Sequence, residues 1–134
     1  MIVVDTNIIA YLLLPGDWTA MAEKAARKDV WCAPLLWRSE FRNVLALYLR
    51  RRAISFEDAV RQMEAAEHLL RGREYAVTSS AVLELVRRSN RSAYDCEFVA
   101  LAEDLGIRLV TTDEPVVKEF PRVAIHLRDY VSAH

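Results

Sequence analysis

The sequence predicts an α/β fold in which a parallel central sheet is flanked by helices. Short runs rich in β-branched and apolar residues alternate along the chain with longer stretches of helical periodicity. These runs are apolar at successive positions, as expected of strands that are buried on both faces by covering helices. The length of 134 residues fits one domain, so we expect a single α/β unit over residues 1–134.

The first half of the chain alternates strands and helices that end at proline or glycine. Pro15 and Gly16 stop the first helical stretch, and Pro34 closes the second strand. The expected elements are a strand at Met1–Val4, helices at Thr6–Leu14 and Trp18–Lys28, a strand at Val30–Ala33 and a helix at Leu35–Arg52.

The second half carries the clearest helix boundaries. Ser55 and Ser92 each precede an acidic residue by three positions, which resembles a capping box, and Gly72 and Gly106 stand just beyond helix ends. The expected elements are helices at Ser55–Leu70, Ser80–Arg88 and Ser92–Leu105, a strand signal at Glu74–Val77, a strand at Ile107–Val110, a helix at Glu114–Phe120 and a strand at Val123–Leu127.

Composition and motifs exclude several classes of protein. Lys and Arg total 18 against 19 Asp and Glu, so the net charge of −1 argues against a purely nucleic-acid-binding module. It leaves a nuclease open, because a carboxylate site offsets basic residues elsewhere. No dinucleotide or P-loop glycine motif is present. The three histidines, His68, His126 and His134, are not placed like a triad base, and His126 is expected to be structural.

The chain is expected to be a soluble, cytoplasmic protein without a membrane span. Cys32 and Cys96 lie far apart and form no CxxC motif, which is typical of reduced thiols rather than a disulfide or zinc site. The longest apolar run, Ile8–Leu14, is much shorter than the roughly 20 residues that cross a bilayer. The N-terminus has no basic leader, and Asp5 interrupts its apolar stretch.

Carboxylates are the remaining candidates for chemistry. Asp5 ends the first strand and Asp113 follows a late strand, so both are expected at the C-terminal edge of a parallel sheet, where α/β folds bind ligands. Asp95 in the first turn of a helix and Glu40 within a helix lie on or beside apolar stripes. An unpaired carboxylate in such a position is costly, so each of them needs a partner.

A purely structural interpretation of these acids stays open. Asp5, Asp95 and Asp113 all stand where a helix N-cap or capping box would use them. Glu40 caps nothing, and its structural alternative is an ion pair with Arg38 or another basic residue. Spacing alone therefore makes a metal site plausible and no more.

Three sequence blocks carry a resemblance to a known family. The chain opens with IVVDTNIIAYLL, a strand ending in Asp followed by Thr and Asn, and continues with WRSEFRNVLALYLRR and SAYDCEFVALAEDLGIRLVTTDEPV. In order, spacing and context these blocks resemble the motifs of PIN domains, particularly toxins of the VapC type. Glu40, Asp95 and Asp113 match the later acidic positions, and the resemblance extends from Met1 to about Leu127.

The resemblance implies an endoribonuclease with a Mg²⁺ or Mn²⁺ site. Such hard cations take oxygen ligands, and a metal-activated water attacks the phosphodiester. Asp5, Asp95 and Asp113 are implied as the main ligands, with Glu40 orienting a water or helping to hold a second ion. The supporting polar residues implied by the family are Thr6, Asn7 and Thr112.

Arginine clusters suggest where the RNA substrate binds. They serve either as a track for RNA phosphates or as solvated helix ends, and the sequence leaves both open. The candidates for RNA binding are Arg50, Arg51, Arg52, Arg87, Arg88 and Arg91, with Arg71 and Arg73 forming a further pair.

Resemblance to the toxins also implies a homodimer and a cognate antitoxin. An antitoxin helix could occupy a groove beside the two helices after Pro34 and direct an Arg or Lys toward the acids. The large aromatics that could anchor another chain are Trp18, Trp31, Trp37, Tyr48 and Tyr75.

Three competing hypotheses place similar acids in other proteins. A phosphatase of the haloacid dehalogenase type needs a second Asp where this chain has Asn7. A phospho-acceptor receiver domain needs paired acids after its first strand and a Lys near the position of Thr111–Asp113. A PIN domain with a scaffold or RNA-processing role, and no toxin role, is the third.

Overall fold

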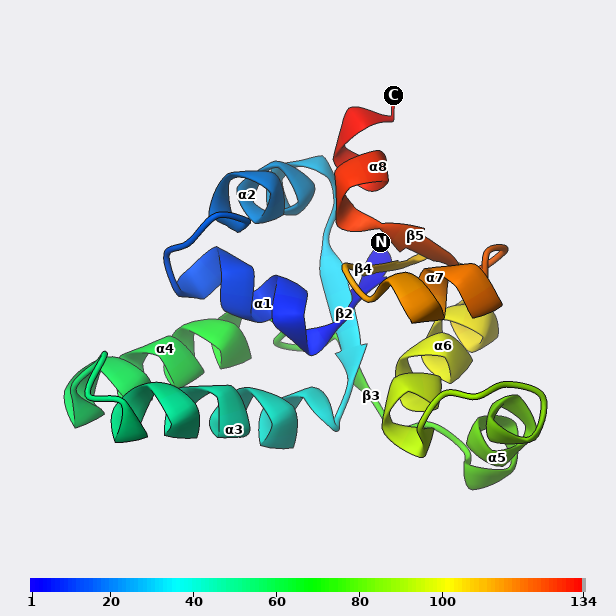
Figure 1. Ribbon diagram of the computed structural model, residues 1–134, viewed down its shortest axis with the longest axis horizontal. Helices are drawn as coiled ribbons and strands as arrows, with labels where there is room; N and C mark the ends of the chain where they lie inside the picture. The colour runs from blue at the N-terminus through cyan, green and yellow to red at the C-terminus, as the bar shows by residue number, and fades with distance from the viewer. Residues whose placement is uncertain (134) are drawn as a thin grey trace.

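The computed structural model describes residues 1–133, so His134 lies outside the described residues, and it contains a parallel five-stranded sheet flanked by helices (Figure 1). The strand order is β3-β2-β1-β4-β5, and every neighbouring pair is parallel. The predicted fold class is therefore confirmed. The strands are β1 (Ile2–Val4), β2 (Trp31–Pro34), β3 (Glu74–Tyr75), β4 (Leu109–Thr111) and β5 (Ala124–His126).

Helices follow the strands along the chain, and their caps form where the sequence signals them. The hydroxyls of Ser55 and Ser92 accept hydrogen bonds from the backbone N–H groups of Asp58 and Asp95. The helices are α1 (Thr6–Leu13), α2 (Thr19–Lys28), α3 (Trp37–Arg50), α4 (Phe56–Leu69), α5 (Ser79–Arg87), α6 (Ala93–Leu105), α7 (Glu114–Glu119) and α8 (Leu127–Ser132).

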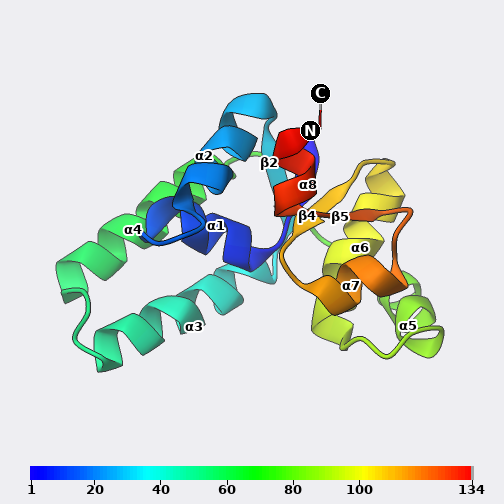
Figure 2. The ribbon, with the colours of Figure 1, turned by 45° about the horizontal axis from the view of Figure 1, so that its top comes forward.

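The sheet separates two apolar cores. Alternate residues of β1 divide between them, because Ile2 and Val4 join one core while Val3 joins the other. The first core packs against α1–α4 and α8, and the second packs against α5–α7, as Figures 1 and 2 show. Trp31 and Trp37 are 1% and 0% exposed within the first core, so the suggestion that they anchor another chain is wrong.

The last two strands differ in extent from the expectation. Gly106 adopts the left-handed conformation at φ +67°, and the N–H of Ile107 returns to the carbonyl of Ala102. This helix cap removes Ile107 from the expected strand, so β4 begins later, at Leu109. The strand ends at Thr111, which pairs with His126 of β5, instead of at Val110.

The strand expected at Val123–Leu127 ends at His126, and α8 follows without an intervening turn. Nδ1 of His126 accepts the N–H of Arg128 and caps α8, and burial lowers the pKa of this imidazole. The ring therefore has the structural role expected of it. None of the helices within residues 1–133 is long and apolar enough to span a bilayer.

The strand order fixes where a ligand crevice belongs. From the central β1, the chain places β2 and β3 on one side and then returns to place β4 and β5 on the other. In open parallel sheets, the crevice lies at the C-terminal ends of the strands where this reversal occurs. Here that point lies between β1 and β4.

Candidate functional site

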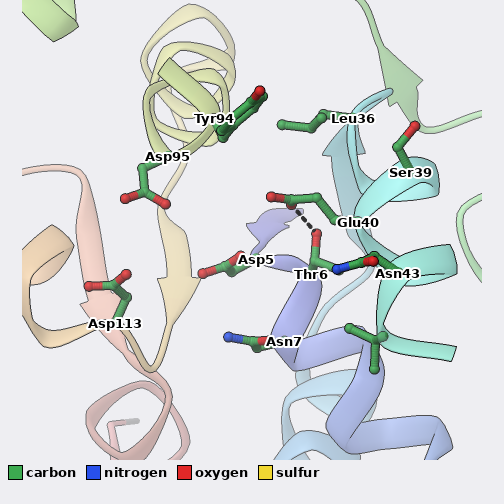
Figure 3. A pocket seen from close by; sticks show the side chains of 11 residues that line it. Asp5, Thr6, Asn7, Leu36, Ser39, Glu40, Asn43, Tyr94, Asp95 and Asp113 are labelled. Atoms are coloured by element: carbon green, nitrogen blue, oxygen red, sulfur yellow. Dashed lines mark hydrogen bonds between the residues drawn. The ribbon is translucent and has the colours of Figure 1, made fainter. Parts of the chain in front are cut away.

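A pocket of about 560 Å³ lies at the predicted edge, and all four predicted acids line it. Asp5 follows β1, Asp113 follows β4, Asp95 comes from α6 and Glu40 comes from α3. Figure 3 shows these carboxylates around a shared space. The lining residues are Asp5, Thr6, Asn7, Leu36, Ser39, Glu40, Asn43, Val44, Tyr94, Asp95 and Asp113, and none of them is basic.

Asp5 stands at the N-cap position of α1, but its side chain makes no capping hydrogen bond. Its Oδ2 instead accepts the hydroxyl of Thr111, at 2.8 Å, from the last residue of β4. The backbone N–H of Asp5 bonds to the carbonyl of Val110, which joins the two strand ends. A capping role therefore does not account for this carboxylate.

Asp113 and Asp95 combine a helix-start position with a place in the pocket. Oδ1 of Asp113 accepts the N–H of Val116 at 3.2 Å, so this side chain does cap α7. The N–H of Asp95 bonds to Ser92, and the Asp95 carboxylate extends toward the pocket (Figure 3). Each carboxylate has two oxygens, so a cap at one of them leaves the other available to a ligand.

Glu40 is held by a hydroxyl rather than by a cation. Its Oε1 accepts the hydroxyl of Thr6 at 2.7 Å, and Thr6 is almost fully buried. Arg38, the suggested ion-pair partner, contacts Glu67 and Glu74 instead. Among the ion pairs within residues 1–133, none includes Glu40, so that structural alternative is wrong.

In the absence of a cation, burial and mutual repulsion disfavour the ionised form of these acids. Burial is the largest cause that raises the pKa of Asp5, Glu40 and Asp95. Like charges add to it, because Asp95 and Asp113 raise the pKa of Asp5, and Asp113 raises that of Asp95. The Thr111 hydroxyl and the backbone of Thr6 oppose this trend for Asp5.

The donor set fits a hard divalent cation that keeps part of its water. The pocket offers carboxylate, hydroxyl and amide oxygens, and it offers no sulfur or imidazole. Within the described chain, no three acidic, histidine or cysteine side chains converge closely enough to hold an ion by themselves. Mg²⁺ suits such an arrangement, since it binds through a few carboxylates and retains several waters.

Of the three supporting residues, Thr6 and Asn7 line the pocket and Thr112 does not. The Thr112 hydroxyl lies 3.0 Å from that of Tyr11, whereas the hydroxyl that contacts an acid belongs to Thr111. Sequence reasoning missed Thr111, because the choice between adjacent threonines depends on where β4 ends.

Sequence reasoning also missed Ser39, Asn43 and Tyr94, which line the pocket beside the acids. Asn43 follows Glu40 by three residues on α3, so it lies on the same helix face. That spacing was the available signal for it. Tyr94 precedes Asp95 directly and is 63% exposed, which no helical pattern would have indicated as part of a site.

The arginine clusters do not line the pocket. Arg50 ends α3 ten residues after Glu40, about 15 Å further along the helix, and Arg51 and Arg52 follow it. Arg91 does influence an acid of the pocket, because its charge lowers the pKa of Asp95. In the other cluster, three ion pairs join Arg87 to Glu84, Arg88 to Glu103 and Arg91 to Glu119.

The chain has a parallel sheet with acids after β1 and β4 and on two flanking helices. These features define a class of α/β protein that gathers carboxylates where the strand order reverses. The PIN domain family matches residues 2–125, and this chain belongs to that family. A curated relative, Ribonuclease VapC3 of Pyrobaculum aerophilum, is 29% identical over 124 residues, which cover 90% of this chain and 95% of the relative.

Solved structures agree with the fold. FitAcB from Neisseria gonorrhoeae has a TM-score of 0.76 at 15% identity, with 96% of this chain and 99% of that chain covered. VapC20 of Mycobacterium tuberculosis, described as a toxin that cleaves the sarcin–ricin loop, has a TM-score of 0.59 at 26% identity. That comparison covers 83% of this chain and 87% of the toxin.

Proposed function

We propose that this chain is a metal-dependent endoribonuclease that hydrolyses RNA phosphodiester bonds, as the toxin of a type II toxin–antitoxin pair. The observation that carries the proposal is one pocket lined by four carboxylates and by no basic side chain. The names of the ribonuclease and toxin relatives support the RNA substrate. The nuclease unit spans residues 1–134.

Asp5, Asp95 and Asp113 are the residues that hold the cation, directly or through water. A bound Mg²⁺ or Mn²⁺ supplies an activated water at neutral pH and offsets the negative charge that develops at phosphorus. The Thr111 hydroxyl fixes Asp5 by bonding to Oδ2, which leaves Oδ1 for the ion. The cap at Val116 fixes Asp113 in the same way.

Glu40 orients the attacking water or helps to hold a second ion. Thr6 occupies Oε1 of Glu40, so Oε2 is the atom free to accept a proton or a hydrogen bond from water. Burial raises the pKa of Glu40, which brings this carboxylate closer to the pH at which it can exchange a proton.

The pocket repels a phosphodiester until a cation is bound. Phosphate oxygens carry the same charge as the four acids, and no lining residue is basic. Substrate binding and catalysis therefore both depend on the divalent ion, and this dependence separates the nuclease from a scaffold that binds RNA through surface arginines.

The deciding experiment is cleavage of a labelled single-stranded RNA by purified protein with Mg²⁺, with Mn²⁺ or with EDTA. We expect cleavage only with a divalent ion, leaving hydrolytic products. Equal cleavage in EDTA would overturn the metal site. Absence of cleavage under all three conditions would favour the alternative of a PIN domain that serves as a scaffold.

The partners we propose are a second copy of the chain and a cognate antitoxin. Leu47 on α3 and Val60 on α4 are 43% and 39% exposed, so these helices leave apolar surface open for another chain. Light scattering should give twice the monomer mass at micromolar concentration. Co-expression with the neighbouring small open reading frame should relieve growth arrest caused by this chain, and a harmless monomer would remove the toxin assignment.

A further inference from the structure

A second hollow of about 280 Å³ continues from the acidic pocket toward the loop after α1. Asn7 and Val44 line both spaces, so the two hollows share a wall. Figure 3 shows the Asn7 side chain below Asp5, on the side of the pocket away from Tyr94. Three aromatic residues line the second hollow, namely Tyr11, Trp18 and Tyr48.

Two of these rings, those of Tyr11 and Trp18, are held in place before any ligand arrives. Tyr11 and Trp18 stack, with their ring centroids 5.8 Å apart and an angle of 23° between their planes. The ring centroid of His126 lies 5.7 Å from that of Trp18. The Tyr11 hydroxyl lies 3.0 Å from that of Thr112, the residue directly after Thr111, whose hydroxyl positions Asp5. Ordering these side chains therefore does not have to accompany binding.

The chemistry of the hollow differs from that of a phosphate site. No Lys or Arg lines it, and its charged residue is Asp17, so it does not attract a phosphate. Aromatic rings with an amide and phenol hydroxyls at the edges suit a planar, uncharged group that also makes hydrogen bonds. A nucleobase has these properties, and stacking on aromatic rings tolerates any base.

We infer that this hollow binds a base of the RNA strand adjacent to the phosphodiester held over the acids. This inference rests on the proposed nuclease function and adds to it the way in which the single strand is positioned. Asn7 lies at the junction of the two spaces, where it can bond to the base or the sugar. Trp18 and Tyr48 contact the base face or edge, and a double helix does not present an unstacked base to them.

Tryptophan fluorescence gives a test that does not require cleavage. Trp31 and Trp37 are buried, whereas Trp18 is partly exposed, so the difference between wild type and Trp18→Phe isolates emission from the hollow. The probe is a single-stranded hexanucleotide with an uncharged methylphosphonate backbone, used in EDTA. This probe removes phosphate repulsion and leaves the bases. We expect saturable quenching in wild type and its loss in Trp18→Phe.

Variants of Tyr48 assign the binding to the hollow. Tyr48→Ala should weaken binding about ten-fold, since stacking on an aromatic ring contributes that order of affinity per base. Tyr48→Phe should keep binding within about two-fold if the ring carries the contact. Phe56→Ala removes an exposed aromatic outside both hollows and should leave binding unchanged. Thermal melts identify a variant that fails to fold, in which case Tyr48→Leu replaces Tyr48→Ala.

The outcomes separate this inference from the function on which it rests. Absence of quenching in a wild type that cleaves RNA with Mg²⁺ would overturn the base site and leave the nuclease standing. Equal affinity of Tyr48→Ala and Phe56→Ala would overturn it as well. Quenching that is lost in Trp18→Phe and weakened in Tyr48→Ala supports the base site even where cleavage is not detected.

Discussion

Two clusters of carboxylates lie on different sides of the start of α3, and they differ in whether a basic side chain pairs with them. Arg38 and Glu40 are two residues apart on this helix, so their side chains leave it in different directions. Arg38 joins Glu67 and Glu74, while Glu40 joins the acids of the pocket. The carboxylates of the first cluster share a cation of the chain, and those of the second do not.

In the cluster around Arg38, the guanidinium donates hydrogen bonds to both carboxylates. Nε and Nη2 of Arg38 donate to Oε1 and Oε2 of Glu74 at 2.6 and 2.8 Å, and Trp37 Nε1 donates to the same carboxylate at 2.7 Å. Nη1 of Arg38 donates to Glu67. The hydrogen bonds from Arg38 hold the pKa of Glu74 below its ordinary value and raise that of Arg38.

In the pocket, the pKa values of Asp5, Glu40 and Asp95 are raised, because burial disfavours their charged forms. Ionising these three acids therefore opposes folding, whereas the Arg38 cluster ties α3, α4 and β3 together. Groups that destabilise the fold and share one pocket are typical of a functional site. Pairing of the carboxylates with a cation of the chain, rather than their number, therefore separates the structural cluster from the candidate site.

The largest expected effect is on activity. Asp5→Asn keeps the shape and the acceptor for the Thr111 hydroxyl but removes a cation ligand, so RNA cleavage with Mg²⁺ should fall by at least about 100-fold. Glu74→Gln changes a carboxylate in the paired cluster and should leave the rate within about three-fold. Initial rates of cleavage of one labelled RNA measure both variants.

Equal losses in the two variants would show that the assay reports folding rather than the site, and full activity of Asp5→Asn would remove Asp5 from the ligands. Melting curves recorded under the assay conditions separate these cases, because Asp5→Asn is expected to remain fully folded.

The second effect concerns stability and falls on the other cluster. Glu74 is 14% exposed and supplies acceptors to both Arg38 and Trp37, so Glu74→Gln leaves the guanidinium with Glu67 as its remaining carboxylate. We expect a loss of roughly 2 kcal/mol in the free energy of unfolding, measured with denaturant. Glu84→Gln, which breaks the fully exposed pair with Arg87, is the matched control and should not move the midpoint measurably. A loss in the control as large as that in Glu74→Gln would contradict the distinction.

The sequence predicted that acids gather at one edge of the sheet better than it predicted the exact bounds of the strands. Asp5 and Asp113 follow apolar runs, and parallel topology is enough to bring both to one edge. Motif resemblance added Glu40 and Asp95. Helical spacing alone left Asp95 open to a capping role and Glu40 open to an ion pair. The structure places all four in one pocket, while their role as ligands stays a prediction.

Other features depend on geometry that local patterns do not encode. The hydroxyl that contacts Asp5 is that of Thr111 rather than Thr112, because Val110 pairs with Val4 and the next residue of β4 therefore lies beside Asp5. Helix α8 has only six residues and starts directly at His126, so no turn signal separates it from β5. Trp31 and Trp37 are buried in the first core by helices α1–α4 and α8, whose placement emerges only in three dimensions.

The smallest expected effect is a pH-dependent gain in stability when an acid of the pocket is neutralised. In EDTA at pH 7, Asp95→Asn should melt roughly 1–3 °C above wild type, because Asn relieves repulsion with Asp113 and still accepts hydrogen bonds. Calorimetry of both proteins between pH 4 and pH 7 measures the difference. A lower melting temperature for Asp95→Asn at every pH would mean that the charge of Asp95 stabilises the helix start.

The sign of the pH dependence follows from the raised pKa of Asp95. Between the ordinary carboxyl pKa and the raised one, the folded state binds more protons than the unfolded state, so wild-type stability falls as pH rises through this window. Asp95→Asn lacks that contribution, and its advantage should therefore vanish toward pH 4 and be fully present at pH 7. Saturating Mg²⁺ should reverse the order at pH 7, because a ligand of the native state stabilises wild type more than the variant that binds it poorly. No such reversal is expected for Glu74→Gln, whose acid faces Arg38 rather than the pocket.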